Sequence, residues 1–233
     1  VYASVDVVIE DNIIRDIAKD GAIIKEVDGA VIQHNQVSRT GRVSTSNGLW
    51  YYDSVRSVIR RNEGFDCLAP MGNDGGPFSI DNACQDCEIV ENYSHDNEGP
   101  RFMLFGRWGT GRGCAARDNV SYNDNGVDPT RKSYATDKGG WGSVTVIGPA
   151  GDMDVKDNVF VAGPDTKRVL AHHDWGGLPV EVRYSGNLFH GGGDADIGPE
   201  VIRAARFGDG SVFEDVRDLP RGLTASPAPG ARG

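Results

Sequence analysis

The chain has 233 residues, 38% of them hydrophobic, and a formal net charge of −10 at pH 7. This length predicts one domain with a sizeable core, and the sequence contains no run of 18 apolar residues that could span a membrane. The acidic balance argues against a nucleic acid or an anionic membrane as partner, and against a polyanionic sugar chain unless calcium bridges the two. The 32 glycines and 11 prolines favour a turn-rich β protein.

A short apolar segment followed by one asparagine recurs along the chain at intervals of 23 to 39 residues. The residues three and five positions before each asparagine are small or apolar, which predicts a strand with those side chains facing inward. Units of this size cannot bury their own apolar face and therefore stack on copies of themselves. The asparagines of the repeat are Asn12, Asn35, Asn62, Asn92, Asn119, Asn158 and Asn187.

A second strand is expected upstream in each unit, at 21–24, 48–52, 77–80, 101–105, 143–147 and 169–172. The unit is thus a strand, a turn, a strand, an asparagine bend, a strand and a variable loop. Asparagine suits a tight bend because it tolerates the left-handed conformation, and stacked asparagines can bond to one another.

These repeats resemble the right-handed parallel β-helix of the pectate-lyase-like superfamily, with an internal asparagine ladder. The resemblance implies an all-β solenoid of about seven coils over residues 5–190, with a C-terminal cap or tail at 191–233. The superfamily hosts lyases, hydrolases, epimerases and non-catalytic adhesins, so the fold leaves the activity open.

A narrower stretch, 74–81 together with 92–105, resembles bacterial secreted β-helix proteins, many of which have an aspartate in the place of Ser79. An extracellular bacterial location follows from this similarity. The first coil already begins at Val5, so we expect either that a leader and cap were removed or, as the favoured alternative, that this is a fragment that lacks its N-terminal cap. Residues 126–140 suggest an insertion beside the groove, and 223–231 resemble the ending of many extracellular β-helix proteins.

Aromatic side chains offer candidate sugar platforms. In the strand at 48–52, alternation places Leu49 and Tyr51 inside and leaves Trp50 and Tyr52 outside, where their rings could stack on a sugar unless the loop at 67–76 covers them. Trp175 is a third candidate, in a His-His-Asp-Trp cluster at a strand end.

Two aspartates are candidates for an acid pair. Asp53 and Asp81 each lie five residues after a glycine, and alternation places Ser79 and Asp81 outside. We therefore expect the two carboxylates one rung apart, as in a glycosidase, or as a Ca²⁺ site with Asp74. The alternative is that they bond turn amides. Asp20 is expected to be a solvated turn residue, and residues 95–97 a turn.

Arg101 and His172 are the candidate bases. Alternation places Arg101 at an outward-facing position. There it could clamp a substrate, act as the base of a lyase or form an ion pair with Asp81. His172 could act as acid or base, bind a metal, or lie in the core.

The four cysteines, Cys67, Cys84, Cys87 and Cys114, favour at least one disulfide in an exported chain. Cys87 and Cys114 share an inward position in successive coils, which suits either a bridge or two stacked thiols. Cys67 and Cys84 could close the loop between them.

These features together predict a secreted carbohydrate-active enzyme that cleaves a polysaccharide or oligosaccharide in a groove on the solenoid, with hydrolysis slightly favoured. The alternatives are a Ca²⁺-dependent lyase, which would use Arg101 or His172 as base, and a non-catalytic glycan-binding or adhesin-like β-helix.

Overall fold

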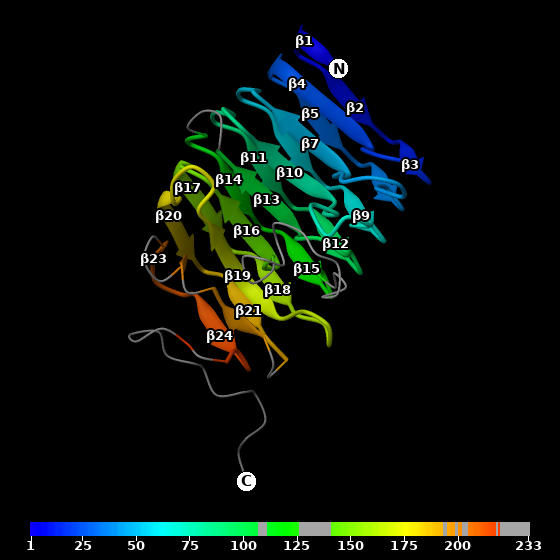
Figure 1. Cartoon of the computed structure of the whole chain (residues 1–233). Helices are drawn as coiled ribbons and strands as arrows, with labels where there is room; N and C mark the ends of the chain where they lie inside the picture. Colours follow the sequence, from blue (N-terminus) through cyan, green and yellow to red (C-terminus); the bar gives the residue numbers. More distant parts are fainter. Residues whose placement is uncertain are drawn as a thin grey trace.

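In the computed structural model, the described residues are 1–106, 111–125, 141–192, 195–198, 200–201, 205–217 and 219. The insertion expected at 126–140 and the C-terminal motif at 223–231 lie outside this set. The strands wind into a solenoid whose three walls are parallel sheets of eight strands each (Figure 1). From the first strand of a sheet to the last, the chain makes about seven turns. None of the described segments forms a helix long and apolar enough to cross a membrane.

Successive strands visit the three sheets in turn. Sheet A contains, in order, β1 (Tyr2–Val5), β4 (Ala22–Asp28), β7 (Leu49–Tyr52), β10 (Phe78–Asp81), β13 (Phe102–Phe105), β16 (Val144–Ile147), β19 (Arg168–His173) and β22 (Asp196–Ile197). Sheet B contains β2 (Val8–Glu10), β5 (Val31–Gln33), β8 (Val58–Arg60), β11 (Glu88–Val90), β14 (Ala115–Arg117), β17 (Gly151–Lys156), β20 (Val180–Ser185) and β23 (Ala205–Phe207). Sheet C contains β3 (Ile13–Arg15), β6 (Gln36–Ser38), β9 (Glu63–Phe65), β12 (Tyr93–His95), β15 (Val120–Tyr122), β18 (Val159–Val161), β21 (Leu188–His190) and β24 (Val212–Glu214).

The repeat pattern therefore predicted the architecture correctly. The upstream strands form sheet A, the strands before each asparagine form sheet B, and those after it form sheet C. The sheets also include three strands beyond residue 190, so the winding extends through Glu214.

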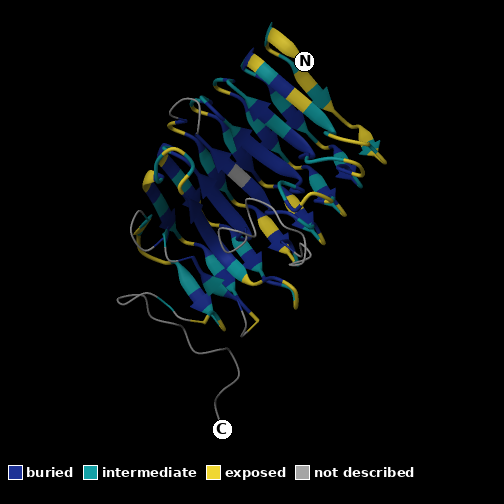
Figure 2. Cartoon of the chain, viewed as in Figure 1, coloured by how far each residue is buried: buried dark blue, intermediate teal, exposed yellow. Residues whose placement is uncertain are grey.

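The core fills the centre of the solenoid because every strand turns alternate side chains inward. Ile32, Ile59 and Ile89 pair in register on sheet B and are fully buried. Phe189 stacks between Phe160 and Phe213, with ring centroids 5.0 and 4.9 Å apart. Burial is continuous along the axis, as the dark blue strands of Figure 2 show.

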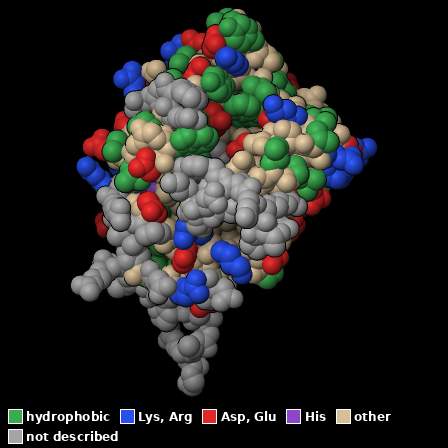
Figure 3. All heavy atoms as spheres, viewed as in Figure 1, with side chains coloured by type: hydrophobic (Ala, Val, Ile, Leu, Met, Phe, Trp, Pro, Cys, Tyr) green, Lys and Arg blue, Asp and Glu red, His purple; other side chains and the backbone are tan. Residues whose placement is uncertain are grey.

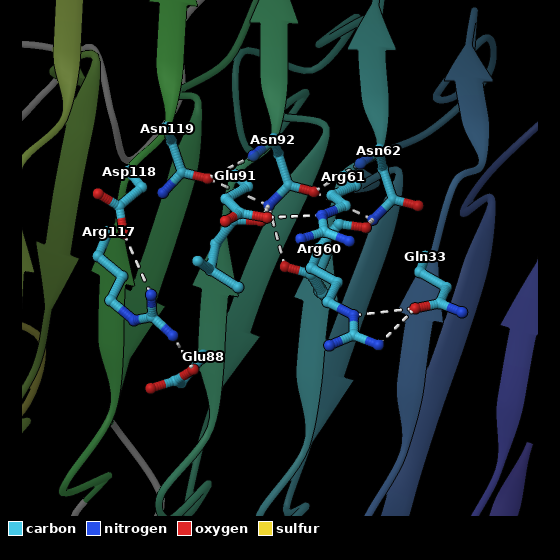
Figure 4. Close-up of polar contacts among 12 residues, drawn as sticks. Gln33, Arg60, Arg61, Asn62, Glu88, Glu91, Asn92, Arg117, Asp118 and Asn119 are labelled. Carbon is cyan, nitrogen blue, oxygen red and sulfur yellow. Dashed lines mark hydrogen bonds and ion pairs between the residues drawn. The ribbon is translucent and has the colours of Figure 1, made fainter.

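The asparagines form one row at the bend between sheets B and C, confirming the expected ladder. Each side-chain Nδ2 donates to the Oδ1 of the asparagine in the next coil, over 2.8 to 3.1 Å. The same Oδ1 accepts the backbone N–H of the preceding asparagine. Figure 4 shows Asn62, Asn92 and Asn119 in this arrangement, above the surface pairs Arg61–Glu91 and Arg117–Glu88.

One detail of the bend differs from expectation. The left-handed residue is not the asparagine but the residue before it, with φ between +52° and +63° in all seven bends. The preceding residue turns the chain from sheet B to sheet C, and the asparagine side chain is left free to turn inward and join the ladder. Asp is common at this position because its side chain tolerates the left-handed region. The left-handed residues are Asp11, His34, Arg61, Glu91, Asp118, Asp157 and Gly186.

Replacing a central ladder asparagine should be far more destabilising than replacing the first one. In Asn92→Ala, the buried backbone N–H of Asn62 loses its acceptor and the carbonyl of Ile59 loses its donor. We expect the free energy of unfolding to fall by about 3 kcal/mol, since each unsatisfied buried group costs roughly 1–3 kcal/mol. Asn12→Ala is the matched control, because Asn12 is exposed. Urea unfolding of both variants measures the difference, and equal losses would contradict the prediction.

Candidate functional site

The outer face of sheet A carries the predicted aromatic side chains. Trp50 pairs in register with Ile23 and Ser79, and Tyr52 pairs with Lys25 and Asp81. Leu49 and Tyr51 are fully buried, whereas Trp50 and Tyr52 are partly exposed, so the predicted alternation is confirmed.

Trp50 and Tyr52 are held in defined positions on this face. The indole Nε1 of Trp50 donates a hydrogen bond to Oδ1 of Asp20 over 3.1 Å. The two rings meet edge to face, with centroids 6.0 Å apart. The ammonium of Lys25 lies 4.9 Å from the centroid of the Tyr52 ring and shields part of it. Trp50 is therefore the better placed of the two to stack on a ligand.

Asp81 ends β10 beside these rings. Its Oδ1 accepts a hydrogen bond from Ser79 Oγ. Ser79 occupies an outward-facing position of its strand as expected, but its side chain is fully buried rather than exposed. Burial raises the pKa of Asp81 to about 8; the Ser79 hydrogen bond opposes this shift, and the charges of Asp74 and Asp20 add to it.

Asp74 and Asp20 complete what we call the acid cluster (Asp20, Asp74 and Asp81). Asp74 forms a parallel bridge with Ser46, and burial followed by the charge of Asp20 raises its pKa to about 7. Oδ1 of Asp20 accepts the backbone N–H of Asn47 as well as the Trp50 indole. Figure 3 shows acidic side chains among hydrophobic ones on this side of the molecule.

Carboxyl groups that titrate near neutral pH can both donate and accept protons at that pH, which is the requirement for general acid–base chemistry. Because each cluster member is partly exposed, a ligand on the face could reach them.

The expected pairing of Asp53 with Asp81 is wrong. Leu49 pairs with Phe78, so the count from the two glycines is displaced by one residue and Asp81 lies opposite Tyr52. Asp53 occupies the next corner with φ +51°, and its Oδ1 accepts the backbone N–H of Ala83 over 3.2 Å. It thus bonds a turn amide, and it also lines a shallow open depression of about 520 Å³.

Arg101 is not on the outer face. It is fully buried, and its guanidinium donates to the carbonyl oxygens of Asn92, over 2.6 Å, and Val120. The guanidinium carbon lies 5.7 and 5.6 Å from the ring centroids of Phe78 and Phe102. The alternation rule predicted the wrong direction for this side chain because Arg101 precedes β13. At that corner the backbone turn, and not the strand, determines where the side chain points.

Burial lowers the pKa of Arg101 to about 9, and the charge of buried Asp124 opposes that shift. Asp124 is itself bonded to Ser94, Ser121 and Asn97. Arg101 is therefore part of an internal polar network and cannot clamp an external substrate. Asp96 has φ +56°, which agrees with the turn expected at 95–97.

His172 also lies in the core. It pairs with inward-facing Val146, and its Nε2 lies 2.9 Å from the hydroxyl of Tyr184. Burial lowers the pKa of His172 to about 3, so the ring is neutral near pH 7. The alternative of a core histidine is the correct one.

Trp175 packs against an apolar cluster on the outer side of sheet A. Its ring lies 5.2 Å from Phe105, next to buried Ile147 and Trp141. This cluster covers the C-terminal half of the face, while the acid cluster and Trp50 occupy the N-terminal half. The predicted residues Trp50, Tyr52, Asp74 and Asp81 are thus brought together, whereas Asp53, Arg101, His172 and Trp175 are not.

The metal and disulfide expectations are not supported. Within the described residues, no three His, Cys, Asp or Glu side chains are arranged to hold a metal ion, so Asp53, Asp74 and Asp81 do not form the expected Ca²⁺ site. All four cysteines are free and buried. The thiols of Cys87 and Cys114 donate to the carbonyl oxygens of Ser54 and Cys84 in place of a bridge, and burial raises the pKa of Cys67 to about 12.

Asp20 was missed, since it was expected to be a solvated turn residue. Its own sequence neighbourhood carries no signal for a site. The register between coils places it there, because Asp20 and Asn47 each lie two residues before a paired position of sheet A, Ala22 and Leu49.

The raised pKa of Asp81 predicts a pH-dependent stability. Between its ordinary value of 3.8 and about 8, the folded chain binds more protons than the unfolded chain, so this group makes the free energy of unfolding fall as pH rises. Asp81→Asn removes the effect, and the variant should gain stability relative to the parent between pH 5 and pH 8 in urea unfolding.

Asp16→Asn is the control. The hydrogen bond from Arg39 lowers the pKa of Asp16, so its titration lies below this pH range and the stability difference from the parent should stay constant. A constant difference for Asp81→Asn as well would show that Asp81 is ionised throughout.

The fold and the face can now be compared with known proteins. A search of curated proteins returned no match. Residues 1–146, more than half of the 233, match the family described as "Right handed beta helix region". The parallel sheets, the three-strand coils and this match agree, and the chain belongs to the right-handed β-helix family.

Proposed function

We propose that the outer face of sheet A binds a polysaccharide and hydrolyses a glycosidic bond, with Asp81 as the proton donor. The observation that carries the proposal is the pair of carboxyl groups, Asp81 and Asp74, whose pKa values burial raises to about 8 and 7 beside the partly exposed Trp50. Perturbed carboxyls of this kind concentrate at catalytic sites.

Glycosidases need one carboxyl group that is protonated and a second that is ionised. The charge of Asp74 adds to the raised pKa of Asp81, so near neutral pH the two carboxyl groups titrate as a coupled pair. In this range, Asp81 donates its proton to the oxygen of the leaving sugar as the glycosidic bond breaks. Ionised Asp74 forms the new bond to the anomeric carbon as nucleophile, or acts as the base for the water that does so. Asp20 holds Trp50 in place for stacking on the sugar ring.

The positions of Arg101 and His172 favour hydrolysis over the lyase alternative. A lyase needs a base that removes a proton from the sugar, and both candidates for that role lie in the core. The acid cluster would also repel a uronate chain, so a neutral polysaccharide is the better substrate class. The extracellular location remains a prediction on which this chemistry does not depend.

A non-catalytic glycan-binding β-helix is the second candidate. The observation in its favour is Ser79, which stands where many similar secreted proteins have an aspartate and is buried against Asp81. In that case the face would bind glycan through Trp50 without cleaving it.

Release of reducing ends from neutral polysaccharides such as xylan, β-glucan and galactomannan tests the proposal. Asp81→Asn should lower kcat by about 100-fold or more, since a general acid contributes 10²–10⁴-fold. Parental activity should fall as pH rises through 8, because Asp81 loses the proton that it must donate.

Asp53→Asn is the matched control. Asp53 lies one residue beyond Tyr52, the register partner of Asp81, so this substitution should leave kcat unchanged. Equal losses in the two variants would exclude the assigned role of Asp81. Binding without cleavage by the parent would favour the non-catalytic candidate, and products with a new ultraviolet absorbance would favour a lyase.

A further inference from the structure

The outer face of sheet C carries aromatic and aliphatic side chains that the proposed site on sheet A does not use. Tyr93 is 42% exposed, Val120 43% and Tyr122 52%, although all three lie on neighbouring strands of one sheet. Phe65 and His95 lie beside them, each partly exposed. We call these five residues the sheet C platform.

The rings of the platform are ordered against one another. His95 stacks on Phe65 with centroids 5.0 Å apart and an interplanar angle of 5°, and on Tyr93 at 4.8 Å and 28°. Register explains the first stack, because Phe65 and His95 are paired on adjacent strands.

Polar contacts hold the central ring of this stack in place. Nδ1 of His95 lies 2.7 Å from Oδ2 of Asp96, and Nε2 lies 3.5 Å from Oε1 of Glu63. Asp96 is in turn held by Asn123, whose Nδ2 donates to its other oxygen over 2.6 Å. The platform is thus preorganised, which reduces the entropy lost when a ligand binds.

The chemistry around the rings selects the occupant. Glu63 and Asp96 place two carboxylates at the edge of the stack, and their charges add to the effect of burial in raising the pKa of Tyr93. Carboxylates accept hydrogen bonds from hydroxyl groups but repel an anionic chain or the same acidic face of a second copy. Aromatic rings present large rigid surfaces at low entropic cost, which suits the apolar faces of sugar rings.

We propose that the sheet C platform is a second glycan-binding surface, which holds a neutral polysaccharide by stacking sugar rings on Tyr93 and Tyr122. Tyr93 and Tyr122 lie on adjacent strands, which are about 4.8 Å apart. Because Tyr93 pairs with Val120 and Tyr122 pairs with His95, the two tyrosines are diagonal neighbours. The bound chain crosses these two strands obliquely, and its hydroxyl groups donate to Glu63 and Asp96. Because sheets A and C are different walls of the solenoid, the platform retains the polymer without occupying the acid cluster.

Affinity electrophoresis in gels that contain a soluble neutral polysaccharide tests this surface. Suitable probes are hydroxyethylcellulose, xyloglucan, galactomannan and soluble starch, with polygalacturonate as the anionic comparison. All variants carry Trp50→Ala, which removes the main stacking residue of sheet A and makes the result independent of the proposed hydrolysis. We expect this background variant to be retarded by at least one neutral polymer and not by polygalacturonate.

Adding Tyr93→Ala and Tyr122→Ala should weaken that retardation about tenfold, the scale of one or two aromatic contacts. Adding Val8→Ala is the control, because Val8 is exposed on sheet B, outside both proposed binding faces, and its truncation should leave the retardation unchanged. Tyr93→Phe with Tyr122→Phe keeps the rings and should retain most of the binding. If the double alanine variant fails to fold, Tyr122→Ala alone replaces it, since Tyr122 is the most exposed of the platform residues.

Unchanged retardation after loss of both rings would overturn the proposal, as would an absence of retardation by every neutral polymer or a preference for polygalacturonate. Sedimentation velocity provides the other decisive outcome. A concentration-dependent dimer that disappears in Tyr93→Ala would show that the platform is instead an interface between copies of this chain.

Discussion

Hydrogen bonding between equivalent residues of successive coils is the constraint on which the structure depends. A bend that recurs seven times would leave seven sets of buried polar groups unpaired if each coil stood alone. The asparagine ladder solves this problem along the axis, since the Oδ1 of each asparagine after Asn12 accepts from the coil before it. The residue before each asparagine adopts the strained left-handed conformation, and the ladder offsets that strain.

Because the coils stack, equivalent residues of successive repeats lie in columns along the solenoid axis. Inside, the columns are mainly apolar and close-packed, and the polar groups among them form hydrogen bonds, as in the asparagine row, the His172–Tyr184 contact and the network around Arg101 and Asp124. A buried charge needs a partner and satisfied hydrogen bonds. The network therefore links the corner between sheets C and A to the bend between sheets B and C, where Arg101 donates to the carbonyl oxygens of Asn92 and Val120.

Outside, the walls differ in chemistry. Sheet A combines acidic groups of raised pKa with an indole and is closed at one end by the cluster around Phe105. Sheet B carries ion pairs such as Arg117–Glu88 and Arg183–Asp154, which suit a solvated wall. Sheet C exposes stacked aromatic rings. In a polymer-degrading protein, one wall that cleaves and another that holds the same chain would act together, because the retained polymer stays at high local concentration.

The sequence by itself determined the period, the asparagine row, the inward columns of sheet B and the outward position of Trp50 and Tyr52. These features follow from alternation within one strand, which is a local property of the chain. Only the tertiary structure decided that Asp81 lies opposite Tyr52, that Arg101 and His172 face the core, and that Asp20 reaches Trp50. Those outcomes depend on the register between coils and on the direction of corner residues. Both are determined by loops of unequal length, so no fixed count along the sequence can supply them.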